Sequence, residues 1–127
     1  MIEELRNLLN NAYSPYFNYP VACILVCKDG KRFFGVNVET ASPSSGICAE
    51  RNAIYSAIAS GYKKDDFKEL HIMNKTDKYS YPCFICRQAL VEFCSSCDIF
   101  VYKFDGTFNK VNALELCPYS FDGDNLK

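Results

Sequence analysis

The sequence predicts an α/β fold built on a mixed sheet of roughly five strands. Short apolar runs bounded by turn residues indicate strands, and segments with apolar residues at helical spacing lie between the later runs. An Asp-Gly dipeptide joins the first two runs directly, which favours an antiparallel hairpin. The later strands alternate with helices, and such connections need crossovers, so that part of the sheet should be parallel.

The chain begins with a predicted helix and hairpin. Apolar residues recur at helical spacing in the first dozen positions, and the pattern breaks near Ser14-Pro15. The near-continuous apolar run Val21–Cys27 is typical of a strand that is buried on both faces. Asp29-Gly30 then predicts a tight turn, and Arg32–Val36 is the expected return strand.

The rest of the chain alternates helices and strands. A helix is expected from Cys48 to about Ser60, closed by Gly61, and a second helix is expected to open at Pro82 as a first-turn proline. The remaining predicted elements are strands at 70–73, 99–102 and, more weakly, 108–111, and a short helix at 112–116. No linker or internal repeat interrupts the pattern, so we expect a single domain over residues 1–127.

Composition and charge argue against two classes of partner. The net charge is -1, the sequence pI is about 5.8, and no run of Lys and Arg is longer than two residues. A polynucleotide binder normally carries a basic patch, so a nucleic-acid polymer is not expected. No apolar stretch approaches the roughly 20 residues that span a bilayer, so no membrane partner is expected either. A small, weakly charged molecule is the better partner.

Eight cysteines in a chain of 127 residues raise the question of a disulfide framework. The acidic N-terminal residues lack the apolar segment of a secretory signal. We therefore expect a cytoplasmic protein whose thiols are free or bound to metal.

Three of these cysteines form a pattern that predicts a zinc site. Cys48 opens one predicted helix, and Cys83 and Cys86 lie three positions apart at the start of another. Helix N-termini lower the pKa of thiols and favour metal ligation. Three protein ligands leave one zinc position open, as catalytic sites do, whereas structural sites have four. Glu50 lies within the same turn as Cys48, where it can move protons without ligating the metal.

The other candidate groups receive plainer interpretations. Zinc with three thiolates carries a formal charge of -1, so a cation should offset the sulfur charge; Arg51 is the favoured residue and Arg87 the second. The second Cys-x-x-Cys, Cys94 to Cys97, lies at a predicted helix end without a preceding proline or an acidic partner, so a redox pair or a second zinc site stays open there without being favoured. His71, the only histidine, is expected to be structural.

The chain resembles the small zinc-dependent cytidine deaminases that act on free nucleosides. Five ordered blocks carry the resemblance: Ala12–Tyr16, Gly35–Ser42, Cys48–Ile54, Pro82–Gln88 and Glu115–Phe121. It implies a three-layer α-β-α fold and one zinc ion per chain, held by Cys48, Cys83 and Cys86. The implied reaction is hydrolytic deamination of cytidine and deoxycytidine by a zinc-bound hydroxide, within pyrimidine salvage.

The same resemblance implies roles for further residues. Glu50 would be the catalytic proton shuttle, and Asn37 and Glu39 would bind the sugar. The backbone of Ala49 and Tyr81 would orient the pyrimidine, and Tyr19 stands where the family usually has a phenylalanine that packs on the base. Phe121 would reach into the site of a neighbouring subunit, which implies a homotetramer.

Other functions are weighed beside this one. Deamination of a cytosine-nucleoside antibiotic such as blasticidin S is the nearest alternative, and Glu39 and Arg51 favour the nucleoside enzyme over it. A catalytically silent zinc-binding module is the second, and the retained Glu50 argues against it. Bulky residues at Tyr81 and Phe84, where the family has small ones, flank the zinc loop and are expected to shape the entrance.

Overall fold

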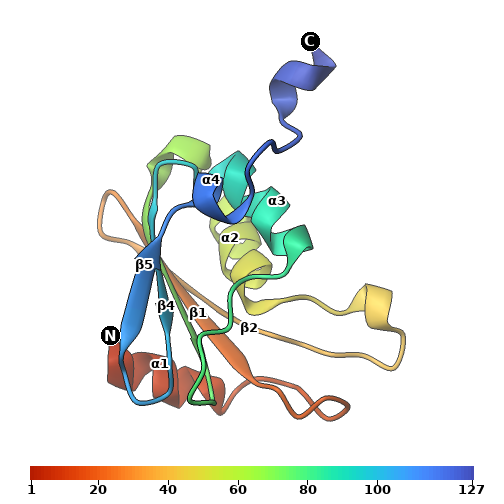
Figure 1. The fold of residues 1–127 in the computed structure, drawn as a ribbon, viewed down its shortest axis with the longest axis vertical. Coiled ribbons are helices and arrows are strands. Elements are labelled where there is room, and N and C mark those ends of the chain that lie inside the picture. The colour runs from red at the N-terminus through yellow and green to blue at the C-terminus, as the bar shows by residue number, and fades with distance from the viewer.

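Five strands and four α-helices make up the computed structural model, which describes residues 1–127 (Figure 1). The elements are α1 (Ile2–Leu9), β1 (Val21–Cys27), β2 (Arg32–Val36), α2 (Ala49–Ala59), β3 (Phe67–Asn74), α3 (Phe84–Phe93), β4 (Asp98–Tyr102), β5 (Phe108–Val111) and α4 (Ala113–Leu116). Short 3-10 turns lie at Pro43–Ser45, Lys64–Asp66 and Gly123–Leu126. No helix is long and apolar enough to cross a membrane.

The strands form one mixed sheet in the order β2-β1-β3-β4-β5. β1 pairs antiparallel with both β2 and β3, β3 pairs parallel with β4, and β4 pairs antiparallel with β5. The predicted hairpin is present, and Gly30 in its turn has a φ of 93°, a conformation that glycine adopts without steric cost. The single parallel pair is the one whose strands are joined by a helix, α3, as the crossover argument requires.

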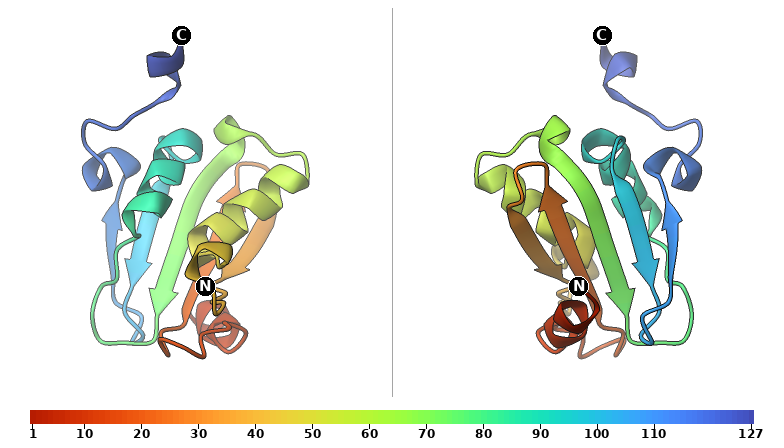
Figure 2. Two further views of the ribbon diagram at one scale, coloured as in Figure 1. Left: turned by 90° about the vertical axis from the view of Figure 1, so that its right-hand side faces the viewer. Right: turned by 90° about the vertical axis from the view of Figure 1, so that its left-hand side faces the viewer.

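Helices cover both faces of the sheet, which confirms the three-layer α-β-α architecture (Figure 2). Successive side chains of β1 point to opposite faces of the sheet, so its residues are divided between two cores. Cys23, Leu25 and Cys27 pack with α2, α3 and α4 in the larger core, whereas Ala22 and Ile24 pack against α1 in the smaller one. The two cysteines of β1 therefore share a face, as their even spacing predicts, and both are buried.

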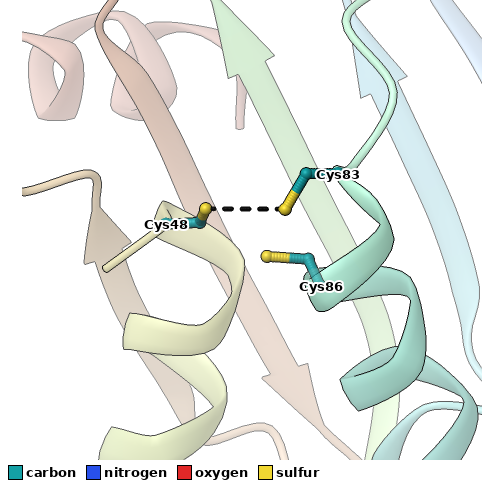
Figure 3. Close-up of side chains that lie close together, drawn as sticks. All are labelled: Cys48, Cys83 and Cys86. Carbon is teal, nitrogen blue, oxygen red and sulfur yellow. Dashed lines mark hydrogen bonds between the residues drawn. The ribbon is translucent and has the colours of Figure 1, made fainter. Parts of the chain in front are cut away.

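Pro82 does not open α3 as the sequence suggested. The helix begins at Phe84, and Cys83 is its N-cap with extended backbone, φ -65° and ψ 165°. The first helical hydrogen bond runs from the Arg87 amide to the Cys83 carbonyl, at 2.8 Å. The extended cap leaves Pro82 outside the helix and directs the Cys83 side chain toward α2 (Figure 3).

The first turn of α2 lies unusually close to β2, at Gly35. A Cβ atom at this position would stand 2.2 Å from the Ala49 carbonyl oxygen and 2.5 Å from the Ala53 nitrogen. The Asn52 side chain also donates to the Val36 carbonyl at 3.0 Å, which ties the same turn to the same strand. The absence of a side chain at Gly35 thus sets the depth at which α2 packs on the sheet.

We predict that Gly35→Ala destabilises the protein. The new methyl group meets backbone atoms, which cannot rotate away, so α2 must shift; overpacking of this kind costs about 1–3 kcal/mol. That cost exceeds the modest gain from a stiffer unfolded chain. Urea unfolding followed by circular dichroism measures the change.

Gly123→Ala is the matched control, because its Cβ would meet no atom within 4 Å. It should change the free energy of unfolding by no more than about 0.5 kcal/mol. Equal stability of the two variants would show that α2 moves off β2 without cost, and would contradict the role given to Gly35.

Candidate active site

Three thiols meet between α2 and α3 (Figure 3). Cys48 is the N-cap of α2, Cys83 is the N-cap of α3, and Cys86 lies in the first turn of α3. Their sulfur atoms all lie within 4.8 Å of one another, and those of Cys48 and Cys83 are 3.7 Å apart. Tetrahedral zinc with Zn–S bonds of about 2.3 Å places its sulfurs about 3.8 Å apart, so the cluster fits this ion.

The guanidinium group of Arg51 binds the sulfurs from behind. Its Nε donates to Cys86 at 3.4 Å and its Nη2 donates to Cys48 at 3.5 Å. Arg87, the second candidate for this position, instead donates to the carbonyls of Pro82 at 2.7 Å and Leu116 at 2.8 Å. Arg51 therefore contacts the thiols directly, whereas Arg87 holds the backbone on either side of α3.

Hydrogen bonding prepares one of these thiols to bind a cation. The pKa of Cys48 is lowered to about 5, because hydrogen bonds from Cys86, Arg51 and Cys83 together outweigh burial, which raises it. The pKa of Cys86 is raised, because this thiol donates to Cys48 and is buried. These hydrogen bonds thus favour the thiolate form of Cys48, which is the form that ligates a metal.

Glu50 lies in the first turn of α2 and is only 5% exposed. Burial raises the pKa of its carboxyl to about 7. Its carboxylate is not part of the three-thiol cluster, and a cation bound there would oppose the effect of burial. Glu50 is therefore a buried acid beside the cluster, and burial alone would bring its pKa close to neutral pH.

The cluster opens into a pocket of about 580 Å³. This volume suits a small organic molecule, and the mix of apolar walls with few polar groups is typical of such sites. The lining residues are Phe17, Tyr19, Val21, Asn37, Glu39, Cys48, Ala49, Glu50, Ile72, Ser80, Tyr81 and Cys83. The structure thus brings together the site residues expected from the sequence, except that Arg51, Cys86 and Phe121 do not line this pocket. Phe84, expected to shape the entrance, does not line it either and instead lies against the Arg87 guanidinium.

Asn37 binds the loop that forms one wall of the pocket. Its Oδ1 accepts from the Val21 amide and its Nδ2 donates to the Tyr19 carbonyl, each at 2.8 Å. An amide side chain offers two donor hydrogens and two acceptor lone pairs. One of each is used here, so Asn37 retains one donor and one acceptor for another group.

Glu39 binds the same loop. Ser14 donates its hydroxyl to Oε2, and the amides of Tyr16 and Phe17 donate to Oε1 at 2.9 and 3.1 Å. Desolvation works against ionisation of this carboxyl, but these hydrogen bonds outweigh it and lower its pKa. Glu39 is therefore held as a carboxylate with its direction fixed.

The two tyrosines of the pocket each have a partner for their hydroxyl. Tyr19 forms a hydrogen bond with Ser80, and Tyr81 accepts from the Asn109 side chain of β5 at 2.7 Å. Phe121 lies outside the pocket of its own chain, with 56% of its surface exposed. The Phe121 carbonyl accepts from the side chain of Gln88 on α3 at 2.7 Å, and this bond holds the C-terminal segment against α3.

Sequence reasoning did not identify four of the pocket residues. Phe17, Val21, Ile72 and Ser80 line the cavity, and none belongs to a motif of ligands or acids. Ser80 lies three positions before Cys83, so closeness to the cysteine pair was the one available signal.

His71 and the second cysteine pair lie outside the pocket. His71 is buried, stacks on Phe100, contacts Tyr102 at 2.8 Å and Glu69 at 3.2 Å, and does not line the pocket. Cys94 and Cys97 are 0% and 3% exposed within the larger core. Neither His71 nor the Cys94–Cys97 pair belongs to the three-thiol cluster.

Comparison with known proteins places this arrangement in a family. Residues 1–102 match the model of the cytidine and deoxycytidylate deaminase zinc-binding region. The chain is 34% identical to a cytidine deaminase of Mycoplasma genitalium over 122 residues, covering 95% of this chain and 92% of that protein. It is 32% identical to a cytidine deaminase of Sporosarcina psychrophila over 127 residues, covering 99% and 92%.

A solved structure gives the same result in three dimensions. The crystal structure of cytidine deaminase from Burkholderia pseudomallei superposes with a TM-score of 0.89 at 36% sequence identity, covering 94% of this chain and 95% of that one. The family match includes all three cysteines of the cluster as well as Glu50. The chain is therefore a zinc-dependent deaminase of the cytidine and deoxycytidylate deaminase family.

Proposed function

We propose that the protein deaminates cytidine and deoxycytidine by hydrolysis, releasing ammonia and leaving uridine and deoxyuridine, as a step of pyrimidine salvage. One observation carries the proposal: the three-thiol cluster and the buried Glu50 open into the same pocket as Asn37 and Glu39. A metal centre with an acid lies at one part of the cavity, and hydroxyl-binding groups lie at another. A nucleoside carries the two complementary parts, a base and a sugar.

Glu50 is proposed to move the protons of this reaction. It takes a proton from the attacking water and passes it to N3 of the pyrimidine while the oxygen bonds to C4. It then transfers the remaining proton of that oxygen to the 4-amino group, which leaves as ammonia as the C4–N bond breaks. Zinc held by the three thiols supplies Lewis acidity, which favours an ionised water at neutral pH. A carboxyl that both accepts and donates a proton suits this role; burial favours the protonated form of Glu50, whereas a cation at the thiols would favour its carboxylate form.

The remaining pocket residues are proposed to orient the substrate. Ala49 is the first residue of α2, so its amide has no acceptor inside the helix and is free for the base. The Tyr81 carbonyl is proposed as the matching acceptor, and Tyr19 packs beside the base. Asn37 and Glu39 are proposed to bind sugar hydroxyls with the donor and acceptor sites that the loop leaves unused.

Arg51 is proposed to moderate the charge of the thiolates. Zinc with three thiolates would carry a formal charge of -1, and this negative charge weakens the Lewis acidity of the metal. The two hydrogen bonds from Arg51 to sulfur offset part of that charge. This arrangement supports one zinc ion per chain in a site that remains reactive.

A panel of substrates tests the function. We expect the purified protein to release ammonia from cytidine and deoxycytidine, and to act poorly on free cytosine, which has no sugar for Asn37 and Glu39. Ammonia release is measured in separate reactions for these three compounds, for blasticidin S and for a cytosine-containing single-stranded oligonucleotide, all at the same concentration. Activity on blasticidin S alone would replace the nucleoside assignment, and activity on the oligonucleotide alone would replace it with a polynucleotide substrate.

We predict that Glu50→Ala keeps its zinc and loses at least about a hundredfold in kcat, the scale of general acid–base catalysis. The thiols and Arg51 are untouched, so metal content by mass spectrometry should stay at one zinc per chain. Glu92→Gln is the control, because it removes an exposed carboxylate on α3 outside the pocket. Turnover by Glu50→Ala at the rate of this control would show that another group moves the protons.

The same measurement tests the second cysteine pair. One zinc per chain is expected in the wild type and in Cys94→Ala, and none in Cys48→Ala. Two zinc ions in the wild type, falling to one in Cys94→Ala, would make Cys94 and Cys97 a metal site.

We also propose that the protein is a homotetramer of single-domain chains, residues 1–127, in the cytoplasm. The eight free cysteines support a reducing compartment. The C-terminal segment supports the assembly: it runs away from the body beyond α4 (Figure 1), and Tyr119, Phe121 and Leu126 are largely exposed on it. Apolar side chains placed in this way are suited to a neighbouring chain, and Phe121 is proposed to complete the neighbour's pocket.

Subunit mixing tests whether the sites are shared. Phe121→Ala and Glu50→Ala chains should each have low activity alone. After mixing under conditions that exchange subunits, some sites combine an intact Glu50 with an intact Phe121 from the neighbour, and activity should rise above the sum of the two. Activity equal to the sum, or a 14.4 kDa monomer by ultracentrifugation, would contradict the shared site.

A further inference from the structure

Two loops face each other across the pocket, residues 13–20 before β1 and residues 75–82 before α3. The first contributes Phe17 and Tyr19 to the lining, and the second contributes Ser80 and Tyr81. A hydrogen bond between the Tyr19 hydroxyl and Ser80 Oγ is the only one that joins the two loops. The residues are 61 positions apart in the sequence, so this contact exists only in the folded chain.

Apart from this contact, each loop is held on its own side. Tyr19 receives a hydrogen bond on its carbonyl from Asn37, and its amide donates to Ser14, both at 2.8 Å. The second loop is held by Asn74, whose side chain donates to the Lys78 carbonyl at 2.9 Å, and by the Phe104 amide, which donates to the Thr76 carbonyl at 3.0 Å. The side chains of Tyr19 and Ser80 therefore form a bridge between two otherwise independent walls.

Tyr19 connects the two ends of the cavity. Its backbone is fixed by Asn37, one of the two residues proposed to bind the sugar. Its hydroxyl reaches Ser80, three positions before the zinc ligand Cys83. The ring between these two anchors must therefore lie along the stretch of wall that a base would face when its sugar is at Asn37 and its reactive carbon is at the metal.

We propose that the Tyr19–Ser80 bridge fixes this wall and thereby sets the affinity for the nucleoside, with Ser80 as a positioning residue that acts through Tyr19. The inference rests on the proposed function for the identity of the ligand. The bridge touches neither the thiols nor Glu50, so its loss should raise KM while leaving kcat within about twofold. A net hydrogen-bond contribution corresponds to about a two- to tenfold change in KM.

The test compares five variants with the wild type, four at the bridge and one control. Tyr19→Phe removes one hydroxyl of the bridge, Ser80→Ala removes the other, and the double variant removes both. Because one bond is lost in each case, all three should show the same rise in KM, and the double should add nothing to the singles. Ser80→Thr keeps a hydroxyl and should restore most of the affinity. Tyr16→Phe is the control, since this exposed tyrosine lies in the same loop and its hydroxyl has no partner.

A second readout does not depend on catalysis. Amide hydrogen exchange by mass spectrometry should show faster exchange in residues 75–82 when Tyr19 is changed, and in residues 13–20 when Ser80 is changed. Only a bridge transmits each substitution to the opposite loop. This measurement remains valid if the wild type deaminates none of the nucleosides, a result that would overturn the proposed function alone.

Additive rises in KM, or exchange that quickens only in the substituted loop, would overturn the bridge. An equal loss of kcat and of kcat/KM in Ser80→Ala would also overturn it, because such a change places Ser80 in the chemical step.

Discussion

The meeting of two helix N-termini is the constraint on which the site depends. Cys48 caps α2, while Cys83 caps α3 and Cys86 lies in its first turn, so the positive ends of both dipoles point at one cluster of sulfurs. The closeness of α2 to β2 at Gly35 and the grip of Arg87 on Pro82 and Leu116 set the position of each terminus. The sheet and the packing of its helices thus bring together thiols that lie 35 positions apart.

The polar residues of the pocket have a second task, which is to hold its wall. Asn37 and Glu39 together accept or donate five hydrogen bonds to the segment between Ser14 and Val21. A loop without regular structure normally satisfies its amides with water, and here a carboxylate and an amide side chain do so instead. The groups proposed to recognise the sugar are consequently rigid before any ligand arrives, which lowers the ordering cost of binding.

Periodicity and spacing carried most of the fold and the centre of the site. The apolar run at Val21–Cys27, the turn at Asp29-Gly30 and the mixed sheet all follow from local pattern, and the cysteine spacings identify the ligands. The helix boundary at Pro82 was wrong because a proline fits both the first turn and the residues ahead of a cap, and only the backbone of Cys83 decides between them. Ser80 escaped notice for another reason: its partner is 61 positions away, and no local pattern records a contact between loops.

The two Cys-x-x-Cys pairs of α3 show why a motif alone does not define a metal site. Cys83 and Cys86 stand at the N-terminus, where free amides and Arg51 stabilise negative sulfur. Cys94 is the C-cap of α3 and Cys97 follows it, where free carbonyls disfavour a thiolate, and both side chains lie within the larger core. Hydrogen bonding to Cys97 and burial raise the pKa of Cys94 well above its usual value, whereas the hydrogen bond from Cys94 lowers the pKa of Cys97, with a further contribution from Lys28. The same spacing therefore serves ligation at one end of the helix and packing at the other, because only the N-terminal pair meets a third thiol, that of Cys48.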